Sequence, residues 1–242
     1  MIEIRDLVKK FGTKTAVNDL NLHIQKGEFF TFLGPNGAGK TTTLKIIAGL
    51  LRPTSGQVFI NNCDIATNKS VVKKLISYVP DVPYVYEKLT GREFLYFIGE
   101  LYKLDKGYYL QEVEYLLDIF QMKESGDLLM ENYSHGMRQK IVLGSTLLHK
   151  PELIIIDEPM VGLDPRNIRL VKDLLLERTK NGTTIFMTTH TLTLAEELSD
   201  RIGIINKGKL ITIGTVEEIK KRAESSEGLE EIFLRLTSEF FI

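Results

Sequence analysis

One eight-residue segment constrains the fold of this chain more than any other. "GPNGAGKT", Gly34 to Thr41, matches the pattern G-x-x-x-x-G-K-[ST] in full. It follows the apolar run "FFTFL" (29–33), which predicts a buried strand, and it opens "KTTTLKIIAGL", which predicts a helix ending near Gly49. A strand, a glycine-rich turn and a helix in this order predict a phosphate-binding loop in an α/β fold.

The loop supplies the groups that bind a nucleoside triphosphate. Glycines let the backbone wrap tightly, so that N–H groups face phosphate oxygens, and the helix N-terminus adds partial positive charge. Lys40 is expected to neutralise the β- and γ-phosphates of ATP, and the Thr41 hydroxyl to bind Mg²⁺. An ordinary glycine turn is the alternative, which the strand–turn–helix setting disfavours. The residues assigned to the nucleotide here are Gly34, Pro35, Asn36, Gly37, Ala38, Gly39, Lys40, Thr41 and Thr42.

A second apolar strand ends in acids. "LIIIDEP" (153–159) places Asp157 and Glu158 at the carboxyl end of a buried strand, where ligands bind in open α/β sheets. We expect Asp157 to bind Mg²⁺, directly or through water, and Glu158 to orient and deprotonate an attacking water. A helix-capping pair of acids is the alternative. His190 ends the strand "TTIFMTT" and is expected at the same edge, beside the γ-phosphate.

The rest of the chain predicts a P-loop NTPase core with a mostly parallel sheet, an N-terminal antiparallel β subdomain and an inserted α-helical subdomain. Alternating strands and helices imply a parallel sheet with helices on both faces. Strands are predicted at 1–11, 16–24, 29–33, 56–60, 75–79, 153–157 and 183–189. Helices are predicted at 165–180 and 192–200, and a hairpin over 201–214 that turns at Lys207–Gly208. A further helix is expected to begin at the capping box of Thr215 and Glu218.

Three helical patterns interrupt this alternation. They cover 90–102, 108–120 and 134–149, and the first opens with a capping box formed by Thr90 and Glu93. We therefore assign 1–82 and 151–222 to the nucleotide-binding core, 83–150 to the inserted helical subdomain, and 223–242 to a short C-terminal helical tail.

Composition narrows the possible partners. The 242 residues are 43% hydrophobic and 26% charged, with a net charge of −1, so a nucleic-acid partner is not expected. Cys63 is the one cysteine, which excludes an internal disulfide. No apolar run approaches the roughly 20 residues of a membrane span, so work at a membrane needs spans from other chains.

Four further motifs carry a family resemblance. "YSHGMRQK" (133–140) resembles the LSGGQ signature of ABC-transporter ATPases: Ser134 and Gly136 match, whereas Tyr133, His135 and Met137 replace Leu, Gly and Gln. "GLDP" (162–165) resembles the family's D-loop and "TTH" (188–190) its H-loop. Phe11 is placed like the aromatic residue that stacks on adenine. The order of these pieces matches over 1–222, which is identified as an ABC ATPase domain.

The resemblance implies a head-to-tail dimer with a second ATPase head, identical or similar. Ser134 and the Gly136 amide are then expected to touch the γ-phosphate of the partner's ATP, which suits a helix N-cap. Asp164 is expected to bridge the two heads. His135 is expected to be tolerated rather than catalytic.

The motifs look most like those of ABC-2 type exporters. The resemblance implies an ATP-hydrolysing subunit on the cytoplasmic face of the cell membrane, bound to integral membrane permease subunits in separate chains. Two alternatives stay open: a soluble ABC ATPase acting on ribosomes or DNA, and a small P-loop kinase. The single phosphate loop and near-neutral charge argue against the first, and the family motifs against the second.

Asp81 departs from the family at the metal. It lies in "PDVP" (80–83), where the family's Q-loop carries a glutamine whose amide oxygen reaches Mg²⁺. A carboxylate is also an oxygen ligand, so Asp81 is assigned as a Mg²⁺ ligand, directly or through water. A solvated loop acid in a coupling hinge is the alternative.

Overall fold

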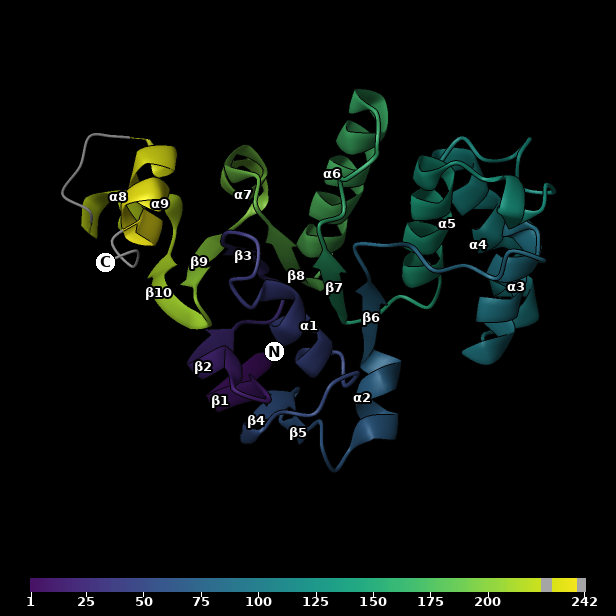
Figure 1. Ribbon diagram of the computed structural model, residues 1–242. Coiled ribbons are helices and arrows are strands. Elements are labelled where there is room, and N and C mark those ends of the chain that lie inside the picture. The colour runs from purple at the N-terminus through teal and green to yellow at the C-terminus, as the bar shows by residue number, and fades with distance from the viewer. Residues whose placement is uncertain (223–227, 239–242) are drawn as a thin grey trace.

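The protein is built around one parallel-rich sheet. The computed structural model describes residues 1–222 and 228–238, and among these a six-stranded sheet has the order β10-β9-β3-β8-β7-β6 (Figure 1). Its strands are β3 (Phe29–Leu33), β6 (Ile76–Val79), β7 (Leu153–Asp157), β8 (Thr184–Thr189), β9 (Arg201–Asn206) and β10 (Lys209–Gly214). The first five run parallel, and β10 pairs antiparallel to β9 as the predicted hairpin.

Both faces of the central strands β3, β7 and β8 are buried, which explains why these strands are rich in apolar residues. In β7, Ile154 and Ile156 pack into the cluster that includes α6 (Pro165–Lys180). Leu153 and Ile155 face the opposite cluster, which includes α1 (Lys40–Ile47). Figure 1 shows α6 and α7 (Leu192–Leu198) on one side of the sheet and α1 on the other. The prediction of helices on both faces is confirmed.

An antiparallel sheet lies below α1 (Figure 1). It has the order β2-β1-β4-β5, with β1 (Ile2–Phe11), β2 (Lys14–Ile24), β4 (Ser55–Ile60) and β5 (Cys63–Asp64). Apolar side chains that alternate along β1 and β2 pack against α1, so the alternation in the sequence marks the buried face. The predicted strand 16–24 is two residues short, because β2 begins at Lys14.

The segment between β4 and β6 was only partly predicted. The structure contains α2 (Lys69–Leu75) there, and the strand expected from Leu75 begins at Ile76. Only Val72 of α2 is buried, and Asn68 at its N-cap makes no side-chain capping bond. Both usual helix signals, an apolar stripe and a cap, are therefore weak in this sequence.

Helices α3 (Gly91–Leu101), α4 (Lys106–Ile119) and α5 (His135–Leu148) form one block beside β6 (Figure 1). A short 3₁₀ turn, η1 (Met130–Asn132), precedes α5. The capping box of Thr90 and Glu93 at the start of α3 is present as predicted. The assignment of residues 83–150 to a separate subdomain stays a prediction.

The described part of the tail is helical. After α8 (Val216–Arg222), whose capping box of Thr215 and Glu218 is present, α9 (Leu229–Ser238) packs through Leu229 and Ile232 against β9. Residues 223–227 and 239–242 of the predicted helical tail lie outside the described residues. Within the described residues, every helix is too short or too polar to cross a bilayer.

Candidate functional site

A cleft of about 310 Å³ lies at the carboxyl edge of the parallel strands. The phosphate loop forms its floor, and Phe11, Asp81 and Glu158 reach it from three other segments. Phe11 ends β1 and is half exposed, and the Lys9 ammonium lies 4.9 Å from its ring centroid. The exposed part of the ring suits stacking on a flat ligand. The cleft is lined by Phe11, Lys14, Ala16, Asn36, Gly37, Ala38, Gly39, Lys40, Thr41, Thr42, Asp81 and Glu158.

Neighbouring backbone holds the phosphate loop so closely that glycine is required. Gly39 has a φ of 108°, and a Cβ placed on it would lie 2.4 Å from the carbonyl oxygen of Ala16. The turn between β9 and β10 closes the other side, where the Gly208 amide donates to the Ala38 carbonyl at 2.8 Å. These contacts hold the loop between the strand β2 and the β9–β10 turn.

Lys40 is held inside the loop. The residue is 6% exposed, and its Nζ donates to the carbonyl oxygens of Gly34 (2.7 Å) and Pro35 (3.3 Å). Burial lowers the pKa of Lys40, while the nearby carboxylates of Glu158 and Asp157 oppose that shift. The ammonium group therefore stands at the loop, where an anionic ligand would satisfy it better than carbonyl oxygens do.

Asp157 has the properties of a cation ligand. It is fully buried, and its Oδ1 accepts a hydrogen bond from the Thr188 hydroxyl. The side chains of Thr188 and Thr41 lower the pKa of the Asp157 carboxyl, against the effect of its burial. Its Oδ2 has no hydrogen-bond partner, and burial raises the pKa of the carboxyl. Since Mg²⁺ binds through one or two carboxylates plus hydroxyl, water and substrate phosphate oxygens, Asp157 and Thr41 fit that ion. A cluster of three His, Cys, Asp or Glu suited to a metal is absent from the described residues.

Glu158 lies next to two other predicted catalytic residues. Its Oε1 lies 2.9 Å from His190 Nδ1 and 3.8 Å from Lys40 Nζ. Because a carboxylate oxygen accepts, His190 donates through Nδ1. His190 and Lys40, from two different segments, therefore converge on one oxygen of Glu158. The alternative of a capping pair is excluded for α6, whose N-cap is Asp164.

Asp81 lines the cleft from the loop after β6. Its side chain is exposed, and its Oδ1 accepts from the Val82 amide at 2.9 Å. The structure therefore places Asp81 on the same cleft as Thr41 and Glu158, within a local turn of its own loop.

The remaining predicted residues gather in a second pocket of about 320 Å³. Ser134 caps α5, accepting from the Met137 amide, and Asp164 caps α6, accepting from the Asn167 amide at 3.0 Å. This second pocket is lined by Ser134, His135, Gly136, Met137, Lys140, Gly162, Leu163, Asp164 and Asn167. The signature-like and D-loop-like motifs thus share one pocket that contains no residue of the phosphate loop.

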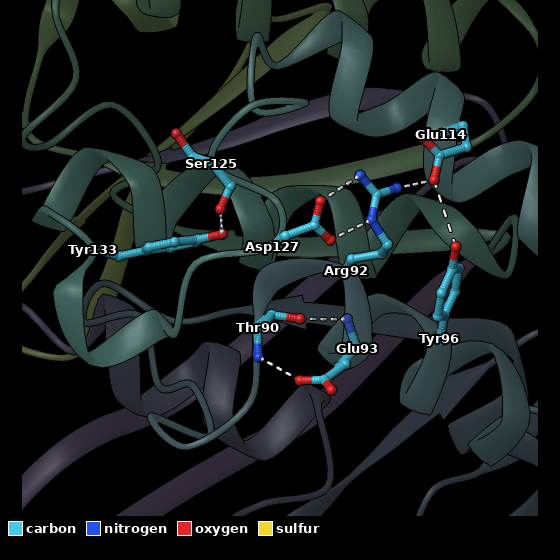
Figure 2. A network of polar contacts seen from close by, with 8 residues as sticks. All are labelled: Thr90, Arg92, Glu93, Tyr96, Glu114, Ser125, Asp127 and Tyr133. Carbon is cyan, nitrogen blue, oxygen red and sulfur yellow. Dashed lines mark hydrogen bonds and ion pairs between the residues drawn. The ribbon is translucent and has the colours of Figure 1, made fainter.

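Tyr133 anchors the segment before this pocket. Figure 2 shows its hydroxyl donating to the Ser125 carbonyl, at 2.6 Å, beside the ion pairs of Arg92 with Asp127 and Glu114. A Cβ on Gly91 would lie 2.4 Å from the Tyr133 oxygen, so glycine is needed there. The tyrosine that replaces leucine is therefore fitted to its surroundings and fixes the backbone that leads into Ser134.

A family model described as ABC transporter matches residues 17–161, more than half of the chain. The chain belongs to the ABC transporter family. The expectation of an ABC ATPase domain is confirmed, and with it the P-loop fold and an ATP-binding, ATP-hydrolysing role. The kinase alternative is thereby excluded.

Curated relatives of this ABC ATPase are subunits of bacterial transport and resistance systems. It is 35% identical to the linearmycin resistance ATP-binding protein LnrL of Bacillus subtilis, over 97% of this chain and 78% of the relative. It is 38% identical to the bacitracin transport ATP-binding protein BcrA of Bacillus licheniformis, over 92% and 72%. A solved ATP-binding subunit of an ABC transporter matches with a TM-score of 0.92 and 31% identity, over 98% of this chain and 99% of that one. These likenesses favour a transporter subunit over a ribosome- or DNA-acting ATPase.

The sequence interpretation missed several residues of this ABC ATPase site. Lys14 and Ala16 line the nucleotide cleft, and Thr188 and Thr189 contact the two acids. The threonines stand directly before His190 on the strand next to β7, which is a signal that could have found them. Lys14 carries no such signal, because its position depends on the β1–β2 turn.

Proposed function

We propose that this ABC ATPase closes head to tail with a second head around two molecules of ATP. The observation that carries the proposal is the separation of two half-sites on one chain. The cleft with Lys40 and the pocket with Ser134 share no lining residue. Two copies related by a twofold axis complete two whole sites, each with the phosphate loop of one head and the Ser134 helix N-terminus of the other.

Chemistry at each site follows from the contacts described. Lys40 exchanges its carbonyl partners for β- and γ-phosphate oxygens, and His190 holds the γ-phosphate. Glu158, no longer in contact with Lys40 and His190, accepts the proton of the attacking water. Thr41 and Asp157 would hold Mg²⁺, which would supply positive charge beside the transferring phosphoryl group. Hydrolysis removes the shared anion, and the heads separate.

An exposed aromatic patch supports a membrane permease as partner. Tyr84 is 80% exposed in the loop after Asp81, and Tyr86 packs edge-on against Phe97 of α3, with ring centroids 5.6 Å apart. Tyr86 also contacts the buried Phe94, so the patch is anchored to the helical block. An exposed aromatic cluster of this kind marks a protein contact. We place the head on the cytoplasmic face of the membrane, against permease subunits in separate chains, in a system that exports its substrate.

Removing this patch is expected to break the complex without affecting the head. Tyr84→Ser with Phe97→Ser should lower co-purification with a co-expressed permease subunit by about tenfold or more, because aromatic anchors dominate such interfaces. Hydrolysis by the free head should stay at the wild-type rate. Tyr115→Ser on α4, also exposed, is the matched control. Unchanged co-purification would place the permease elsewhere.

Replacing Asp81 tests whether its loop binds Mg²⁺ or acts only as a coupling hinge. If Asp81 binds Mg²⁺ directly or through water, Asp81→Asn should raise the Mg²⁺ concentration needed for half-maximal hydrolysis by about tenfold. We expect this result, because Asp81 lines the same cleft as Thr41. Asp173→Asn, an exposed acid on α6, is the control. An unchanged Mg²⁺ dependence would make Asp81 a loop acid of a coupling hinge.

A further inference from the structure

We propose that Thr189 is a positioning residue that holds Glu158 for proton abstraction, an inference that rests on the proposed role of Glu158. The Thr189 hydroxyl donates to Glu158 Oε2 at 3.3 Å. Thr189 is the last residue of β8 and is 1% exposed. A buried hydroxyl on a central strand offers a fixed point that a long carboxylate side chain on a turn does not have.

The ends of β7 and β8 are joined by matched contacts. Asp157 lies opposite Thr188 in the parallel register, and the Thr188 hydroxyl donates to Asp157 Oδ1. The Glu158 amide donates to the Thr188 carbonyl at 3.1 Å. Consecutive threonines thus hold consecutive acids. Successive side chains of a strand point to opposite faces, so each hydroxyl serves one carboxylate.

The two oxygens of Glu158 face different kinds of partner. Oε1 meets Lys40 and His190, both of which the proposed mechanism directs to the γ-phosphate. Oε2 meets Thr189, whose Oγ accepts from the Thr191 amide at 3.0 Å and is therefore fixed by backbone. When phosphate draws Lys40 and His190 away, Thr189 keeps its hold on Oε2. Oε1 is left as the base, already pointing into the cleft.

The backbone conformation of Glu158 is a second reason to expect that contacts from β8 hold this residue in place. Glu158 has a φ of 49°, in the left-handed region that is unfavourable for a residue other than glycine. Residues in such conformations persist when surrounding contacts determine them, and they concentrate at functional sites. Thr188 holds the Glu158 backbone and Thr189 holds its carboxylate, so β8 fixes both parts of the residue.

Three substitutions at position 189 test the proposal. Thr189→Val keeps the shape and removes the hydroxyl, and it should lower the kcat of ATP hydrolysis about tenfold. Its KM and its affinity for ATP should stay within about twofold of wild type, because the hydroxyl acts on the base and not on the nucleotide. Thr189→Ser, which restores the hydroxyl, should recover most of the kcat. Thr189→Ala gives a second loss variant if valine disturbs folding, which circular dichroism and nucleotide binding report.

The double variant Thr189→Val with Glu158→Gln shows whether Thr189 acts through Glu158. Residual hydrolysis should equal that of Glu158→Gln alone. The proposal is overturned by a wild-type kcat in Thr189→Val, by equal losses in the serine and valine variants, or by a further loss in the double variant. Undiminished hydrolysis in Glu158→Gln overturns the role of Glu158 and with it that of Thr189. An inactive Glu158→Gln beside an active Thr189→Val overturns the Thr189 role alone.

Discussion

Replacing Glu158 by Gln is expected to lower ATP hydrolysis by about 100-fold or more, because it removes the general base and keeps the size of the side chain. ATP affinity should stay close to wild type, since in the proposed site the phosphates are held by the loop and Lys40 and not by Glu158. Steady-state phosphate release and equilibrium binding of a fluorescent ATP analogue measure the two quantities separately.

Glu177, which is exposed on α6 and does not line the cleft, provides a matched control. Glu177→Gln should hydrolyse ATP at the wild-type rate. Wild-type turnover in Glu158→Gln would contradict the assignment of the base, whereas loss of both turnover and ATP binding would show that Glu158 supports the loop through Lys40 instead.

Replacing Ser134 by Arg should also reduce hydrolysis by about 100-fold, for a different reason. In the proposed dimer, Ser134 and the α5 N-terminus are donors to the partner's γ-phosphate, and loss of such preorganised donors has effects of this size. The isolated Ser134→Arg head should bind ATP as wild type does, because the pocket that contains Ser134 has no phosphate-loop residue in its lining. Binding measured on dilute protein, beside hydrolysis measured over a range of protein concentration, separates these effects.

Arg138, on the same helix but outside the lining of that pocket, provides a comparison. Its guanidinium contacts Glu87 and the Glu131 carbonyl, so Arg138→Lys changes a nearby cation and leaves the pocket intact. That variant should keep most of its activity. Full hydrolysis in Ser134→Arg would contradict a role for Ser134 in the site.

The sequence predicted the elements that carry strong local signals. "GPNGAGKT" after an apolar strand has one well-known structural context, and the mostly apolar strands 29–33 and 153–157 are buried on both faces as such runs are. The capping boxes at Thr90 and Thr215 are contacts within four residues, so they depend on sequence alone. Helix α2 was missed because it has little apolar surface and no side-chain cap.

Contacts between distant segments could not be predicted in the same way. The Thr189–Glu158 bond joins residues 31 positions apart, and its existence depends on the register of β7 and β8. The closeness of Ala16 to Gly39 depends on how the antiparallel sheet sits on α1. Tyr133 looked like a departure from a motif, and its fit to Gly91 and the Ser125 carbonyl is visible only in three dimensions (Figure 2).

The central claim is that ATP joins two heads through half-sites that one chain keeps apart. Light scattering of the Glu158→Gln variant with Mg²⁺ and saturating ATP tests it most directly. The account predicts a species of twice the 27.5 kDa chain mass with ATP, a 27.5 kDa species with ADP, and a 27.5 kDa species with ATP when Ser134→Arg is added. A 27.5 kDa species for Glu158→Gln at saturating ATP, or a dimer that survives Ser134→Arg, would contradict it.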